Sequence, residues 1–403
     1  MNSICAPIPF PPGNAALESH CRRVAGLCKL IAHQLFLSTE DKERLHLACL
    51  LHHQTEEAVA THGSRIPEGV RAVMESFWHV DKGDPQERVL AAVLRLADAF
   101  DGAVQKNPHP HVEVKRLLAE LRTGIGTGLW SRKIVEAFQE CTKPVQMPPP
   151  QQWRVPVFPQ AAVRTLEAIR SPSVSLPQVV DAARRDPATA GCIMHLANSA
   201  LYSERGEVST LQMAVARIGF VIACKVVATL AMRPLLSIPK LEGLWPHSIE
   251  VADLAEQLTE RSGAIDPGEA YLAGLLHDVG RIALGATTLY DAARLQGLEE
   301  SGCPTVYAED LILHTNHGAL GAQIALTWKL PGRLVAAIEH HHRPEVSSEV
   351  LPSLLYLAEY QTGSVEDLTS NARLRLALST TGLTERDLEG CQRSGVGTWL
   401  AAA

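Results

Sequence analysis

An adjacent histidine and aspartate stand in an otherwise apolar stretch, Leu-Leu-His-Asp-Val-Gly-Arg at residues 275–281. Both side chains are costly to bury unless they are paired or bound to a metal. Divalent metals accept imidazole nitrogen and carboxylate oxygen together. Further histidines that could join them are His247, His317 and the run His340-His341-His342. The pattern indicates a metal centre, and the alternative is that His277 is a hydrogen-bonded imidazole of the core.

The elements that must position these side chains are helices. Apolar residues recur at steps of three and four, which is the period of an amphipathic α-helix, and no alternating strand pattern is persuasive. The predicted helices are 20–36, 41–53, 88–104, 159–169, 176–185, 187–198, 210–232, 269–284, 318–328 and 333–342. Packing of such helices could bring the histidines to the core of one bundle. We therefore predict an all-α fold.

The length and one proline-rich stretch predict the domain organisation. A chain of 403 residues is too long for one hydrophobic core, so two domains are expected. Residues 144–159 read PVQMPPPQQWRVPVFP, and proline at this density excludes helix and central strand. We predict a helical domain at 15–143, this linker, a second helical domain at 155–362, and a tail at 363–403 with one or two helices.

Composition excludes several classes of partner. The net charge is −7 and no run of Lys or Arg is present, so no surface for nucleic acid is evident. No apolar stretch reaches the ~18–20 residues that span a bilayer. The nine cysteines are scattered singly, and the first residues lack the features of a signal peptide. We expect a protein of the cytoplasm with reduced thiols and no membrane association.

The C-terminal half carries a series of short motifs in a fixed order. They are Val155-Pro156-Val157-Phe158-Pro159, Asp186-Pro187-Ala188, Leu196-Ala197-Asn198-Ser199-Ala200-Leu201-Tyr202, Ala214-Val215-Ala216-Arg217-Ile218-Gly219, His277-Asp278-Val279-Gly280-Arg281, His317-Gly318-Ala319-Leu320-Gly321-Ala322, Trp328-Lys329-Leu330-Pro331 and Ala336-Ala337-Ile338. Over residues 155–345 this series resembles an HDOD domain, the signalling relative of the HD phosphohydrolase superfamily. The resemblance implies a bacterial signal-transduction module without established catalysis.

The resemblance also implies a set of metal ligands. Catalytic relatives of the HD-GYP type hold metal at positions that match His247, His277, Asp278, His317 and His341, with His342 as a further candidate; Glu359 stands where those enzymes have a late aspartate. Two further features depart from the HD-GYP pattern. Arg281 replaces a lysine, and Arg343-Pro344-Glu345 replaces the Gly-Tyr-Pro loop. The metal would be Fe, Mn, Zn or Mg, and the alternative is that none is bound.

The N-terminal half contains a second, weaker series. Three motifs of this half resemble the elements of a degenerate HD domain that is similar to the HD-GYP group. They are His20-Cys21-Arg22-Arg23-Val24-Ala25, Leu47-Ala48-Cys49-Leu50-Leu51-His52-His53 and Val93-Leu94-Arg95-Leu96-Ala97-Asp98-Ala99-Phe100-Asp101. His53 stands where the HD aspartate would be. The resemblance implies a mononuclear site from His20, His52 and Asp98, assisted by His53 or His79, or a vestigial centre whose polar groups bond one another.

Three functions are compatible with these patterns. The first is a regulatory protein that acts through signalling partners, with no residue assigned to catalysis. The second is a metal-dependent phosphohydrolase or cyclic-dinucleotide phosphodiesterase that uses His277 and Asp278. The third is a sensor of a nucleotide second messenger without turnover, in which Arg281 or Arg217 grips phosphate. The departures from the HD-GYP pattern favour the first, and the oligomeric state stays open.

Overall fold

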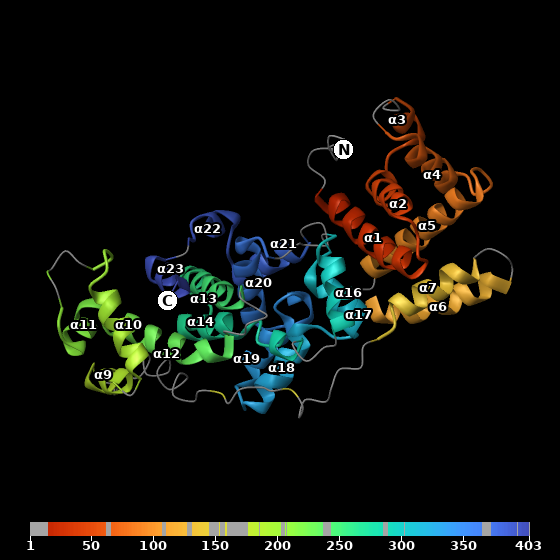
Figure 1. Ribbon diagram of the computed structural model, residues 1–403. Coiled ribbons are helices and arrows are strands. Elements are labelled where there is room, and N and C mark those ends of the chain that lie inside the picture. Colours follow the sequence, from red (N-terminus) through yellow and green to blue (C-terminus); the bar gives the residue numbers. More distant parts are fainter. Residues whose placement is uncertain are drawn as a thin grey trace. The chain divides into compact units, whose positions relative to one another are not determined.

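The structure is a computed structural model, and its described part consists of helices joined by turns and loops (Figure 1). It describes residues 15–61, 66–106, 110–126, 131–144, 153, 158, 176–184, 186–202, 206, 208–236, 243–284, 289–301, 303–364, 372–392 and 394–402. Within these ranges there are α-helices and one short 3-10 helix but no strand, which confirms the predicted all-α fold. The predicted helix 159–169 and most of the predicted linker 144–159 lie outside the described residues.

The chain folds into two compact units. Unit 1 comprises Met1–Met147, Thr287–Asn316 and Glu366–Asn371. Its helices are α1 (Ala15–Gln34), α2 (Thr39–Leu51), α3 (Glu56–Thr61), α4 (Glu68–Trp78), α5 (Pro85–Lys106), α6 (Pro110–Gly126), α7 (Arg132–Cys141), α16 (Leu289–Glu299) and α17 (Thr305–Leu313).

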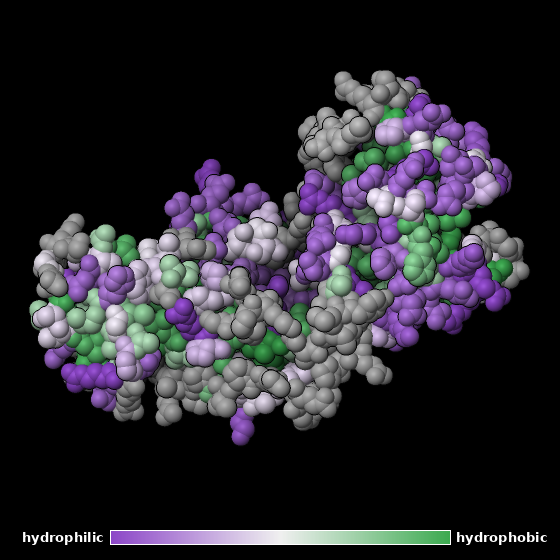
Figure 2. Space-filling model, in the orientation of Figure 1, coloured by the Kyte–Doolittle hydropathy of each residue, from purple (hydrophilic) through white to green (hydrophobic). Residues whose placement is uncertain are grey.

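Helix α1 is the central element of unit 1. It packs against α2, α5, α7 and α16, and it buries Val24, Leu27 and Ile31 completely. The rings of Phe100 on α5 and Phe138 on α7 meet edge to face, with centroids 5.5 Å apart. Hydrophilic side chains predominate on the visible face around α4 and α5 (Figure 2). The apolar period of these helices therefore corresponds to a buried face, as amphipathic helices require.

Unit 2 comprises Pro148–Ala286, His317–Val365 and Ala372–Ala403. Its helices are α9 (Leu176–Arg184), α10 (Pro187–Ala197), α11 (Leu211–Ile218), α12 (Phe220–Leu236), α13 (Leu244–Ser262), α14 (Pro267–Leu276), α15 (Arg281–Leu284), α18 (His317–Thr327), α19 (Gly332–His340), η3 (Pro344–Val346), α20 (Val350–Thr362), α21 (Ala372–Thr381), α22 (Glu385–Glu389) and α23 (Gly395–Ala402). Helix α13 contacts α14, α20 and α23. In the described part of the tail there are three helices, where one or two were predicted.

Two predicted helices are each broken in the structure. The predicted helix 210–232 is wrong as one element, because Gly219 adopts a φ of 90° and separates α11 from α12. L-residues avoid that conformation, so glycine ends the first helix and allows the second to start in a new direction. The predicted helix 269–284 is likewise interrupted at residues 277–280, between α14 and α15.

The units differ from the predicted domains at residues 287–316. The prediction assigned this segment to the C-terminal domain, whereas α16 and α17 pack in unit 1, against α1 and α6 respectively. The Arg294 guanidinium of α16 donates to the backbone carbonyls of Cys141 and Lys143, the latter at 3.2 Å. The chain thus leaves unit 2 after α15 and returns to it at His317.

The described residues contain no single helix with the length and apolar character needed to cross a bilayer. By length and composition alone, α11 and α12 meet that test together, with a bend of 111° between them.

Candidate metal centres

Seven side chains from five places in unit 2 converge, and we call them the C-terminal centre. They are His247 on α13, His277 and Asp278 directly after α14, His317 at the start of α18, His341 and His342 directly after α19, and Glu359 on α20. The structure therefore brings together every residue of the predicted C-terminal set.

Close backbone approaches position these elements. A Cβ atom on Gly280 would collide with the carbonyl oxygen of His317 and lie 2.5 Å from the nitrogen of Gly321. A Cβ atom on Gly274 would lie 2.7 Å from the nitrogen of Ala252 on α13. Glycine at these two positions lets α18 and α13 approach the His-Asp pair directly.

Asp278 lies at the middle of the C-terminal centre. Its Oδ1 is 3.0 Å from Nε2 of His317. Its Oδ2 is 2.7 Å from Nε of Arg281 and 3.7 Å from Nε2 of His277. Burial raises the pKa of Asp278, but the charges of Arg281, His277 and His317 outweigh burial and hold this pKa well below its usual value. The carboxylate is therefore ionised and faces histidines with both oxygens.

Glu359 places its carboxylate among the donors of the centre, although its side chain is longer than that of the aspartate in the HD-GYP pattern. Its Oε1 is 3.1 Å from Nε2 of His277 and 3.6 Å from Nε2 of His247, and its Oε2 is 3.3 Å from Nδ1 of His342. Burial raises the pKa of Glu359, and these neighbours together with His341 lower it well below its usual value. The substitution keeps a carboxylate among the donor atoms.

Two histidines of the centre share one local arrangement. His277 and His341 each follow the last residue of a helix, and each Nδ1 lies 2.7 Å from the carbonyl oxygen three residues earlier, that of Gly274 or Ile338. Each Nε2 then faces the other donors. Burial lowers the pKa of His341 to about 3, so that imidazole is neutral, which is the form that binds metal. A backbone partner that fixes ring orientation is a common feature of metal-binding histidines.

Two members of the C-terminal centre and the neighbouring Arg281 are partly exposed. The exposed fractions of the side chains are 20% for His247, 17% for His342 and 29% for Arg281, while those of the other members are at most 2%. These three side chains are therefore the ones that solvent reaches.

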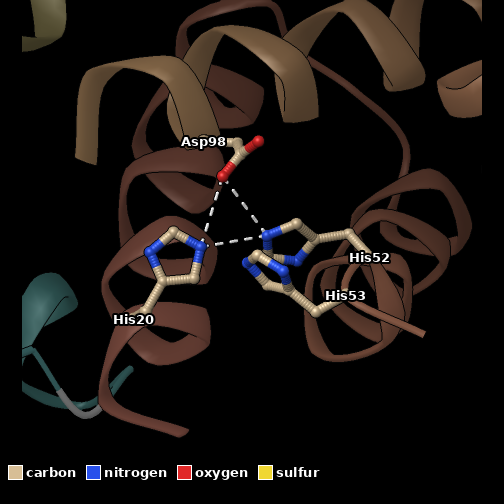
Figure 3. Close-up of side chains that lie close together, drawn as sticks. All are labelled: His20, His52, His53 and Asp98. Atoms are coloured by element: carbon tan, nitrogen blue, oxygen red, sulfur yellow. Dashed lines mark hydrogen bonds and ion pairs between the residues drawn. The ribbon is translucent and has the colours of Figure 1, made fainter. Parts of the chain in front are cut away.

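Four side chains of unit 1 form a second group, the N-terminal centre (Figure 3). His20 lies on α1, His52 and His53 follow α2, and Asp98 lies on α5. Nε2 of His20 is 3.1 Å from Nε2 of His52 and 3.2 Å from Oδ1 of Asp98. Nε2 of His52 is 3.4 Å from the same oxygen. The three residues predicted for this site are thus adjacent, and the exposed His53 joins them.

An outer carboxylate orients His20. Oδ2 of Asp101 is 2.7 Å from Nδ1 of His20, so Nε2 is the nitrogen directed into the centre. The sequence prediction of this site did not include Asp101. A signal was nevertheless present, because Asp101 follows Asp98 by three residues and both carboxylates therefore lie on the same face of α5.

Two of the other histidines predicted at or near this site, His52 and His79, lie in different surroundings. His52 repeats the arrangement of His277, since its Nδ1 is 2.6 Å from the carbonyl oxygen of Cys49. His79, which was predicted as an alternative to His53, lies apart from the centre and pairs with Glu56 at 3.4 Å. Of the two predicted assistants, the structure thus places only His53 at the centre.

The electrostatics of the N-terminal centre differ from those of the C-terminal centre. Burial lowers the pKa of His20, but the hydrogen bonds and charges of Asp101 and Asp98 outweigh burial and raise it to about 9. Burial, together with His52 and His20, lowers the pKa of His53. Burial raises the pKa of Asp98, and the hydrogen bonds and charges of His20 and His52 bring it below its usual value. The centre thus holds one anionic and three imidazole donors.

The donor atoms of both centres fit a divalent metal. In the N-terminal centre, one ligand atom from each of the four residues lies within 4.8 Å of the others. In the C-terminal centre two such groups overlap, and they share Asp278 and His341. Mixed imidazole and carboxylate donors are the chemistry that Zn, Fe and Mn accept.

The two residues predicted to grip phosphate lie in different places. Arg281 contacts Asp278 of the C-terminal centre and is partly exposed. Arg217 lies on α11, and its guanidinium donates to the carbonyls of Ala197 at 3.3 Å and Gly206 at 2.5 Å. These contacts give Arg217 a structural role in the connection between α10 and α11.

The comparison with known families agrees with this arrangement. The family model described as "HDOD domain" matches residues 155–344. Residues 155–344 are an HDOD domain. The match begins before α9 and ends just after α19, so it includes His277, Asp278, His317 and His341 but not Glu359.

Solved structures also resemble a large part of the chain. An HDOD domain protein of unknown function from Geobacter sulfurreducens is 25% identical, with a TM-score of 0.52, over 62% of this chain and 92% of that one. A proposed signal transduction protein from Marinobacter aquaeolei VT8 is 23% identical, with a TM-score of 0.52, over 66% of this chain and 64% of that one. The second likeness shows the fold alone.

One curated relative, an uncharacterized protein from Treponema pallidum (strain Nichols), is 24% identical over 211 residues. The alignment covers 51% of this chain and 41% of the relative, so the chain spans less than half of that protein's length.

Proposed function

We propose that this regulatory HDOD protein acts by binding signalling proteins or a nucleotide, without turning over a substrate. The observation that carries the proposal is the contact between Arg281 and Asp278, at 2.7 Å from Nε to Oδ2. An arginine is always charged. It therefore competes with any metal for the carboxylate oxygen on which a two-metal hydrolytic centre would depend.

The chemistry that a metal would add is well defined. A bound divalent metal lowers the pKa of a water molecule and polarises a phosphoryl oxygen. His247, His277, Asp278, His317, His341, His342 and Glu359 would hold it. Arg281 keeps a permanent positive charge at the C-terminal centre, where His247 and His342 are also partly exposed, and such a set of groups suits binding of a phosphate group. Binding alone can shift a helical protein between two packing states.

The test compares the full-length chain with a His277→Ala, Asp278→Ala double variant. Both are incubated with cyclic dinucleotides and Mn²⁺ or Fe²⁺, and hydrolysis and equilibrium binding are measured. His79→Ala, in an exposed residue outside both centres, is the matched control. We expect no hydrolysis by any of the three proteins. Metal-dependent hydrolysis by the full-length chain and by His79→Ala, lost in the double variant, would refute the proposal.

A hydrolytic function is the second candidate, and one observation favours it. The two overlapping donor groups share Asp278 and His341, and a shared carboxylate is what two neighbouring metals require. If Arg281 is what prevents hydrolysis, Arg281→Lys should permit turnover that the unsubstituted chain lacks. Absence of turnover in that variant would count against this candidate as well.

A further inference from the structure

Helix α17 places the ring of Tyr307 near Arg23 and Asp101, which adjoin the N-terminal centre. Tyr307 is buried, and its ring centre lies 5.9 Å from the guanidinium carbon of Arg23. Burial and the neighbouring Asp101 carboxylate raise the pKa of Tyr307 well above its usual value. Tyr307 thus lies against the ion pair that Arg23 and Asp101 form.

The Arg23–Asp101 ion pair contacts His20, a donor of the N-terminal centre. Arg23 grips Asp101 with two nitrogens, at 2.7 Å from Nε to Oδ1 and 2.8 Å from Nη2 to Oδ2. The same Oδ2 is 2.7 Å from Nδ1 of His20. Arg23 and Asp101 are almost inaccessible to solvent. The orientation of His20 therefore depends on a buried ion pair, and the ring of Tyr307 lies over its guanidinium.

The connection before α17 is pressed against the turn of α1 that carries Arg23. Sγ of Cys303 lies 3.8 Å from the carbonyl oxygen of Arg22 and 3.9 Å from that of Arg23. A Cβ atom on Gly26 would lie 2.5 Å from the same sulfur, so the glycine leaves room for the Cys303 side chain in its present position. The segment that leads into α17 is thus packed closely against α1.

We propose that Tyr307 is a positioning residue of the N-terminal centre, which holds Arg23 on Asp101 and thereby aims Nε2 of His20 at the metal-binding position. Tyr307 belongs to a segment that follows the His-Asp pair of the HDOD domain in the chain and packs in unit 1. The inference concerns the N-terminal centre and is independent of whether the C-terminal centre hydrolyses a substrate.

The experiment measures Co²⁺ binding to the full-length chain through its visible absorption, which reports the ligands directly. All proteins carry His277→Ala and Asp278→Ala, so that the C-terminal centre contributes little. His52→Ala identifies the signal of the N-terminal centre. The variants are Tyr307→Phe, which keeps the ring, Tyr307→Leu, which keeps apolar volume, and Asp101→Asn. Leu311→Ala, a buried position of the same helix, is the control for general destabilisation of α17.

We expect Asp101→Asn to weaken Co²⁺ binding by ~10–100-fold, the usual effect of losing a partner that orients a metal ligand. Tyr307→Leu should weaken it by about fivefold, and Tyr307→Phe and Leu311→Ala should leave it within about twofold. The double variant Tyr307→Leu, Asp101→Asn should bind no more weakly than Asp101→Asn, because both act through one contact.

Three results would overturn the proposal. They are binding by Tyr307→Leu equal to that of the parent, losses that add in the double variant, and a Co²⁺ signal that His52→Ala does not change. None of them bears on the hydrolysis assay at the C-terminal centre, so the two proposals fail separately.

Discussion

At the scale of single residues, the two centres orient histidines in the same way but differ in the charge of their donor groups. His52, His277 and His341 each follow a helix end and turn Nε2 inward, because a backbone carbonyl three residues earlier faces Nδ1. The sequence predicts which histidines meet, but not their orientation, which depends on where each helix ends. The charge differs because Asp278 occupies the position that His53 has in the N-terminal centre.

This difference predicts unequal metal loss. Asp278 is buried, anionic and common to both donor groups of its centre, whereas His53 is exposed and has a lowered pKa. In metal-loaded protein, Asp278→Ala should therefore release more metal than His53→Ala, as measured by elemental analysis after dialysis. Unfolding curves of both variants provide the control. Equal losses, or metal retained only by the N-terminal centre, would contradict this ranking.

The raised pKa of His20 predicts a pH dependence. In the metal-free chain the charged imidazole stabilises the fold fully below its unfolded pKa of about 6.5, and this contribution is lost as the pH rises through about 9. A metal must displace that proton, so the affinity of the N-terminal centre for Zn²⁺ should increase by about tenfold between about pH 7 and about pH 8. Equilibrium Zn²⁺ titrations across this range measure the effect. Asp101→Asn should flatten the dependence, and a flat profile in the unsubstituted chain would exclude a protonated His20.

At the scale of elements, periodicity predicted helices well and their breaks poorly. The apolar period continues through Gly219 and through the His-Asp pair, since buried residues on either side of a turn keep the same character. The apolar period carries no information about the direction in which the next helix runs. That direction is set by the φ of Gly219 and by the close approach of Gly280 to His317, both of which depend on tertiary packing.

The close approach of Gly280 to the backbone of α18 predicts that adding one methyl group at this position strongly destabilises the protein. In Gly280→Ala the new Cβ collides with the backbone of His317 and Gly321, which cannot move as a flexible side chain can. We expect a loss of at least about 2 kcal/mol in the free energy of unfolding, measured with urea, and weaker metal binding at the C-terminal centre. Gly332→Ala is the matched control, because nothing lies within 4 Å of its added Cβ. Similar stabilities of the two variants would argue against the close approach.

At the scale of the whole molecule, the chain passes between two compact units more than once. The proline-rich stretch 144–159 suggested one boundary, and an apolar period reveals that a helix is buried but not which partner buries it. Residues 287–316 illustrate the limit, because α16 and α17 have ordinary helical sequences and still pack with helices from the other half of the chain. The two donor sets were nevertheless predictable, since motif order fixes which side chains meet even when the division into units is different.

The packing of residues 287–316 in unit 1 predicts that this segment loses stability when the N-terminal helices are removed. In a fragment of residues 153–403, α16 and α17 lack the helices against which Leu298, Tyr307 and Leu311 are buried in unit 1. Backbone amides of 289–313 should then exchange at least about tenfold faster than in the full-length chain, because local stability follows buried apolar contacts. Amides of α14 and α18 should keep their protection, since their partners α13 and α19 remain in the fragment. Hydrogen exchange read by mass spectrometry distinguishes the two regions within one sample. Equal protection of 289–313 in both proteins would mean that this segment folds with unit 2, and the positioning role of Tyr307 would lose its structural basis.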